Sequence, residues 1–155
     1  MGFMGGRTAH RMAALGVLLL AGCGSSEPDP MPAACLDEPA AVARALERAP
    51  AAVTLADGTP LSRCVALARR EGDLQALGVV LTQVADGLRA RVEAEPAAAL
   101  RLGYLVGAVR RGEPQTPGLT SQLARRIEQI AALEDGDPVP RAQIARGMAL
   151  GEAGG

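Results

Sequence analysis

Apolar positions recur at steps of three and four residues through most of the chain after residue 37. This period is typical of amphipathic α-helices. It predicts helices over residues 38–49, 62–70, 74–95, 96–112 and 119–133, with 141–150 as a further short helix. The period breaks at 53–61, where the turn pair Asp57-Gly58 predicts an irregular or hairpin-like segment. We therefore expect an all-α fold, a small bundle of about four to five helices.

The best-marked helix is the one predicted over residues 74–95. Its apolar side chains form a single seam: Leu74, Leu77, Leu81, Val84 and Leu88. Polar residues such as Gln75 and Asp86 fall on the opposite face, which we expect to be solvated. The helix over 119–133 carries a comparable stripe from Leu119 to Leu133.

The helix over residues 96–112 is apolar on nearly all sides, so we expect it at the centre of the bundle. Gly103 and Gly107 lie one turn apart and predict a flat face that packs against another helix. The same spacing occurs in pairs of membrane helices, but Arg101 and the short length argue against that alternative. A narrow strip through Arg101 and Tyr104 is expected to face water. An arginine and an aromatic ring are common at the centres of interfaces, which makes this pair the predicted interaction surface.

The first residues of the chain have the organisation of a secretory leader. Arg7, His10 and Arg11 precede a short apolar run, Met12–Ala21, which is too short to span a bilayer. The run ends in Leu20-Ala21-Gly22-Cys23. This tetrapeptide resembles the lipobox of bacterial lipoproteins. The resemblance implies that Cys23 receives a diacylglycerol thioether and becomes the first residue of the mature chain, with the usual fatty acyl chains such as palmitate as its anchor.

The leader and the composition behind it predict four segments. Residues 1–22 are the signal peptide, 23–34 the lipidated N-terminus and a flexible tether, 35–150 the helical domain, and 151–155 a disordered tail. The 16 basic residues are all arginines; Arg7 and Arg11 leave with the leader, so 14 − 17 gives a net charge of −3 for the mature side chains. A mildly acidic chain with scattered arginines does not present the basic face that nucleic-acid binding requires.

Two cysteines remain beyond the anchor, Cys35 and Cys64. In an exported protein such a pair is most simply a disulfide. A metal site and a reactive thiol are the alternatives. A metal site is disfavoured because no histidine and no further cysteine is present to complete a ligand set.

The mature chain offers little catalytic chemistry. It contains no histidine and no lysine, which excludes histidine-dependent nucleophile systems, Walker-type phosphate loops and Schiff-base chemistry. Glu134, Asp135 and Asp137 cluster at a helix end, where a solvated cap is the main interpretation and a weak cation site or acid–base chemistry the alternatives. Asp57 is interpreted as a turn residue. We expect no catalytic residue, no metal and no cofactor.

These observations predict an extracytoplasmic protein held on the cell membrane, or on the outer membrane where the envelope has one, by its N-terminal lipid. The expected function is that of a helical module that binds or scaffolds another cell-envelope component, a protein partner, without catalysis of its own. The alternative is a carrier that holds a small hydrophobic or lipid ligand in the interior of the bundle.

Overall fold

The computed structural model describes residues 1–2, 29–114, 118–133 and 138–155. These ranges contain one short 3-10 helix and six α-helices: η1 (Ala33–Leu36), α1 (Pro39–Leu46), α2 (Leu61–Leu67), α3 (Glu71–Arg89), α4 (Pro96–Gly112), α5 (Leu119–Ala131) and α6 (Pro138–Gly154). The β pairing within them is one isolated bridge between Thr54 and Pro60. The all-α prediction is confirmed, with six helices in place of the expected four to five.

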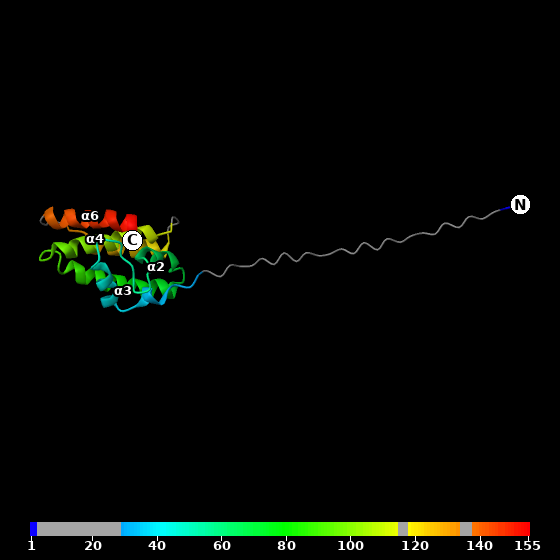
Figure 1. Ribbon diagram of the computed structural model, residues 1–155, viewed down its shortest axis with the longest axis horizontal. Helices are drawn as coiled ribbons and strands as arrows, with labels where there is room; N and C mark the ends of the chain where they lie inside the picture. Colours follow the sequence, from blue (N-terminus) through cyan, green and yellow to red (C-terminus); the bar gives the residue numbers. More distant parts are fainter. Residues whose placement is uncertain (3–28, 115–117, 134–137) are drawn as a thin grey trace.

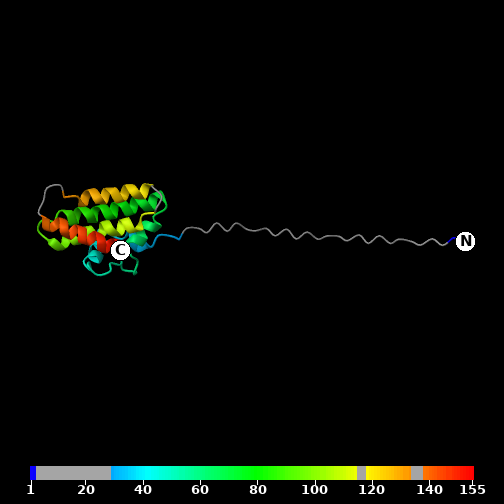
Figure 2. The same cartoon turned by 90° about the horizontal axis from the view of Figure 1, so that it is seen from above.

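Helix α4 lies at the centre of the bundle, as its pattern predicted. It contacts α1, α2, α3, α5 and α6, and 12 of its 17 residues are buried. Helices α3 and α5 lie side by side on one side of it, and α6 lies on another side (Figures 1 and 2). Helices α3, α4 and α5 run in alternating directions, so α3 and α5 are parallel (Figures 1 and 2).

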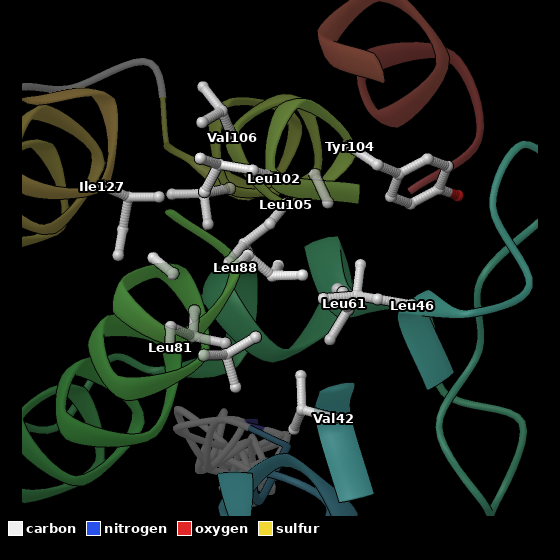
Figure 3. Packing of buried hydrophobic residues seen from close by; sticks show 14 of the residues in the cluster. Val42, Leu46, Leu61, Leu81, Leu88, Leu102, Tyr104, Leu105, Val106 and Ile127 are labelled. Atoms are coloured by element: carbon white, nitrogen blue, oxygen red, sulfur yellow. The ribbon is translucent and has the colours of Figure 1, made fainter. Parts of the chain in front are cut away.

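The hydrophobic core lies where α3, α4 and α5 meet, and α1 and α2 close one side of it (Figure 3). The predicted seam of α3 is buried from Leu77 onward, whereas Leu74 is only partly buried. Leu102 and Leu105 of α4 and Ile127 of α5 are fully buried against it. A single core of mostly aliphatic side chains therefore joins all six helices, with Ile144 as the contribution of α6.

The boundaries of α3 differ from the prediction. A break around Gly72 and Asp73 was expected, but the helix begins at Glu71, after Arg70 in an extended conformation. It ends at Arg89 rather than near Glu95, and a run of turns leads to Pro96. Propensity and capping patterns commonly misplace helix ends by a few residues.

The predicted disordered tail at 151–155 is wrong. Helix α6 continues to Gly154, and Gly151 and Gly155 are buried. Arg111 of α4 donates hydrogen bonds of 2.7 Å to the carbonyls of Glu152 and Ala153. The Ser62 hydroxyl donates to the carbonyl of Gly155. These donors satisfy carbonyls at the end of the helix that have no partner within it, which is why the segment is ordered.

Helices α4 and α6 touch through their backbones. A Cβ added at Gly103 would lie 2.0 Å from the Ile144 carbonyl oxygen, and one at Gly107 would lie 2.1 Å from that of Met148. The contact is reciprocal, because a Cβ at Gly147 would lie 2.1 Å from the Leu100 carbonyl oxygen. Residue numbers rise together along both helices, so the pair is parallel. Glycine is the residue that permits this approach.

The segment between α1 and α2 forms the hairpin-like turn that its sequence predicted. The Leu55 N–H donates to the Thr59 carbonyl at 2.8 Å, and Gly58 has a φ of +86°. The Asp57 carboxylate accepts a 2.9 Å hydrogen bond from the Thr59 N–H. This bond, with a further one from the Thr59 side chain, lowers the pKa of Asp57. Asp57 is thus a turn residue, as interpreted from the sequence.

One arginine joins the ends of three helices. The Arg110 guanidinium of α4 pairs with Glu128 of α5 and, at 3.2 Å, with Glu152 of α6. The hydrogen bond to Glu128 is the main cause of a raised pKa at Arg110. The three side chains of this cluster pair through Arg110, and the two ion pairs hold α5 and α6 against α4.

Candidate binding groove

The predicted interaction surface at Arg101 and Tyr104 is not an exposed strip. Tyr104 is 1% exposed, and its ring lies beneath α6 (Figure 3). The Tyr104 hydroxyl accepts a 3.1 Å hydrogen bond from the backbone N–H of Val53, which lies in the segment before the hairpin turn. Tyr104 is therefore a structural residue, and its prediction as an interaction residue is wrong. The cause is α6, which covers the face of α4 that was expected to be wet.

Arg101 lies at the edge of the buried region. Its side chain is 19% exposed and pairs with Glu95 at 3.2 Å. Its Nε is buried and has no hydrogen-bond partner among the described residues. Arg101 therefore pairs with Glu95, the residue before α4, whereas the Tyr104 hydroxyl bonds to the segment before the hairpin turn.

The structure joins Cys35 of η1 to Cys64 of α2 in a disulfide with a Cα–Cα distance of 5.5 Å. Both residues are 1% exposed. The bond joins η1, which precedes α1, to α2, which follows it. Cys23, the residue of the lipobox, lies outside the residues that the structure describes.

The acidic cluster Glu134, Asp135 and Asp137 also lies outside the described residues. Within the described ranges, histidine, cysteine, aspartate and glutamate residues form no group of three or more that could hold a metal ion. No helix in the same ranges has the length and apolar character needed to cross a bilayer.

A groove of about 890 Å³ lies between α3 and α5, and we call it the α3–α5 groove. Its lining residues are Glu71, Leu74, Gln75, Gly78, Val79, Thr82, Gln83 and Asp86 of α3, with Leu119, Gln122, Leu123 and Arg126 of α5. Val79 is 58% exposed and Leu119 is 54% exposed. Exposed large apolar side chains that gather in a concave surface with polar neighbours mark a candidate binding site.

Apart from the buried hydroxyl of Thr82, the polar groups of the α3–α5 groove are of three kinds. Gln75, Gln83 and Gln122 each carry an amide that can both donate and accept hydrogen bonds. Glu71 and Asp86 are acidic, and Arg126 is basic. These charged side chains form no ion pair with another described residue, although the Glu71 carboxylate accepts a 3.4 Å hydrogen bond from Gln75. The groove therefore combines an apolar centre with hydrogen-bonding and charged groups of both signs.

Thr82 lies in the wall of the groove and is 9% exposed. Its hydroxyl oxygen is buried without a hydrogen-bond partner among the described residues. A buried hydroxyl without a partner costs free energy, so Thr82 is a point of weakness in the contact between α3 and α5.

Sequence reasoning missed this groove. It assigned Leu119 to a buried stripe and treated Gln75 and Asp86 as a solvated face. The signal for the groove that the sequence contained was Val79, an apolar residue that falls outside the seam of its own helix. That signal was weak, because single exposed apolar residues are common on protein surfaces.

Comparison of the chain with known protein families, with curated proteins and with solved structures found no match.

Proposed function

We propose that this chain is a lipid-anchored, extracytoplasmic helical module that binds or scaffolds another component of the cell envelope and has no catalytic activity of its own. The observation that carries the binding role is the α3–α5 groove, with its exposed Val79 and Leu119 between amide and charged side chains. The lipobox resemblance at Leu20-Ala21-Gly22-Cys23 supports the anchor, and the Cys35–Cys64 disulfide is typical of an oxidising compartment.

A surface role accounts for the packing better than a carrier role. The interior around α4 is occupied by aliphatic side chains and by the direct backbone contact with α6. A ligand held in the bundle interior would have to separate α4 from helices that contact it at van der Waals distance. The α3–α5 groove instead lies on the surface, where a macromolecular partner can reach it without such a rearrangement.

We propose that the chain has no catalytic activity because its side chains offer few catalytic groups. Beyond Cys23 the chain has no histidine and no lysine. The two other cysteines are joined in the disulfide. The groove offers Glu71 and Asp86 as potential acid–base groups, and they lie 15 positions apart on one helix, about 22 Å along its axis. That separation is too great for two carboxylates to act on one bond.

The experiment for this proposal is mass spectrometry of the chain purified from membranes of its own host. We expect a mature N-terminus at Cys23 carrying lipid, and we expect Cys23→Ser to retain residues 1–22 and to lose the lipid. An intact, unmodified leader on the wild-type chain would contradict the anchor. A hydrolytic activity of the purified chain that is lost on changing Glu71 or Asp86 would contradict the non-enzymatic role.

A further inference from the structure

We propose that the α3–α5 groove is the contact surface between two copies of this chain, related by a two-fold axis that runs along the helices. This inference rests on the proposed function, because it names the envelope component that the module binds as a second molecule of the same chain. The groove contains groups that complement one another, its charges lie in a register that lets them pair, and its size suits a reversible contact.

A two-fold interface places one surface patch against an identical patch, so the patch must contain the complement of each of its own groups. The α3–α5 groove meets this requirement. Arg126 provides the positive charge that Asp86 or Glu71 can pair with. The amide of Gln122 on α5 can pair with that of Gln75 on α3 of the second copy, since each amide both donates and accepts. Val79 and Leu119 supply apolar surface at the centre.

The register of α3 and α5 determines which charges meet. A Cβ at Gly78 would contact Leu123 Cδ1 at 3.8 Å, which places these two residues at the same level of the parallel helix pair. Arg126 lies three positions beyond Leu123, and Asp86 lies eight beyond Gly78. The axial offset between Arg126 and Asp86 is therefore five positions, about 7.5 Å. An extended arginine side chain spans this offset.

When the two-fold axis runs along the helices, α3 of one copy lies over α5 of the other in the same direction. Arg126 of each copy then reaches towards Asp86 of the second copy, and two equivalent ion pairs form. An axis perpendicular to the helices would instead place α3 over α3 in opposite directions. That arrangement brings Glu71 of one copy against Asp86 of the other, so charge repulsion disfavours it.

The size of the surface predicts a reversible dimer. The groove spans residues 71–86 of α3, about 24 Å, and two adjacent helices are about 20 Å wide. Each copy would bury roughly 500 Å², and the pair roughly 1,000 Å², near the lower limit for a specific interface. Copies that are anchored to one membrane by Cys23 would meet at a high effective concentration, which favours a weak contact of this kind.

The test is cysteine crosslinking of the full chain in membranes of its host. Val79→Cys is placed on one tagged copy and Gln122→Cys on a second, because these positions face each other across the proposed dimer. We expect a covalent species that carries both tags. Ala149→Cys on both copies is the matched control, because Ala149 is exposed on α6, away from the groove, and we expect no such species from it.

Charge variants then test whether the molecule that binds the groove is a second copy of this chain. In copies that carry the crosslinking cysteines, we expect Arg126→Asp alone and Asp86→Arg alone each to reduce the crosslinked species about tenfold, because both ion pairs become like-charge contacts. Co-expression of an Arg126→Asp copy with an Asp86→Arg copy should restore it, because the mixed dimer regains both pairs. Unchanged melting temperatures of the single variants would show that the fold is intact.

Failure of this inference can be distinguished from failure of the proposed function. A lipidated chain in the membrane fraction whose groove cysteines crosslink no better than Ala149→Cys would overturn the dimer and leave the anchored binding module. Crosslinking that the single charge variants do not reduce, or that the mixed pair does not restore, would also overturn it. A chain that crosslinks with the expected charge dependence but retains its leader would overturn the anchor and leave the dimer.

Discussion

Two helix pairs in this molecule pack in opposite ways: α4 and α6 pack closely, whereas α3 and α5 pack loosely. Helices α4 and α6 approach until their backbones touch, and a Cβ at Gly107 would lie 2.1 Å from a carbonyl oxygen. Helices α3 and α5 are held apart by side chains, and a Cβ at Gly78 would make only an ordinary 3.8 Å contact with Leu123. The first pair is closed, whereas the second leaves a groove of about 890 Å³.

If the proposed function holds, the two pairs divide stability from binding. Close packing between α4 and α6 buries Tyr104 and orders the glycine-rich end of the chain. The looser pair leaves Val79 and Leu119 more than half exposed. A closed contact contributes to the stability of the bundle, and an open one keeps apolar surface available for a partner. Variants at matched positions in the two pairs test this division.

The largest expected effect is that of Gly107→Leu in the closed pair. Even the first atom of the new side chain would collide with the backbone of α6, so the helices would have to separate. We expect a loss of stability beyond the roughly 1–3 kcal/mol that is usual for overpacking, or failure to fold. Urea unfolding followed by circular dichroism measures it. Gly107→Ala should also destabilise, because its Cβ alone meets the Met148 carbonyl.

The matched control is Gly87→Ala in α3, where an added Cβ would have nothing within 4 Å. This change should raise stability by up to about 1 kcal/mol, since alanine has the higher helix propensity. Equal effects of alanine at residues 87 and 107 would show that the backbones of α4 and α6 do not touch at Gly107.

The disulfide joins η1 to α2 on the side of the core that α1 and α2 close. Cys35 and Cys64 are 29 positions apart, and closing a loop of that length stabilises a fold by roughly 3–4 kcal/mol in the chain-entropy treatment. We expect the double variant Cys35→Ala and Cys64→Ala to lose about this much in urea unfolding. Quantitative thiol labelling of the unreduced, unfolded wild-type chain at both positions would instead contradict the bond.

Tyr104→Phe tests the hydrogen bond between the Val53 N–H and the Tyr104 hydroxyl, which lies beneath α6. The change removes the acceptor of the Val53 N–H and leaves that buried donor without a partner. The expected cost is about 1–3 kcal/mol, with the helix content unchanged. A variant as stable as the wild type would mean that the hydroxyl does not hold the hairpin segment to α4.

Thr82→Val should have a small effect and, like Gly87→Ala, should raise stability. Valine has nearly the same shape as threonine and removes a buried hydroxyl that has no partner among the described residues. We expect a gain of about 1 kcal/mol or less in urea unfolding. A clear loss of stability would show that the hydroxyl is hydrogen-bonded in solution.

The sequence was sufficient to predict the helices that bury aliphatic side chains. The seam of α3 and the central position of α4 follow from residues such as Leu81 and Leu102, because aliphatic spacing reports burial directly. Helix α6 was predicted too short because its contacts are made by Gly147 and Gly151, which have no side chain to mark a face. The lack of a marked face on α6 also caused the error at Tyr104, because the short helix predicted over 141–150 was not expected to cover α4 there.

The groove could not be predicted for a related reason. It depends on which faces of α3 and α5 remain uncovered, and that is set by the packing of all the helices rather than by the pattern along either one. Leu119 fits the buried stripe of its helix by spacing, yet it lies in the first turn of α5, where the bundle does not cover it.

The most direct test of the account is a comparison of Val79→Arg with Ala149→Arg in membranes of the native host after chemical crosslinking. Both changes place an arginine at an exposed position, one in the α3–α5 groove and one on α6. We predict that Val79→Arg abolishes the crosslinked complex of this chain while Ala149→Arg retains it, with equal amounts of folded protein. Retention of the complex by Val79→Arg, or its loss from both variants alike, would contradict the assignment of binding to the open helix pair.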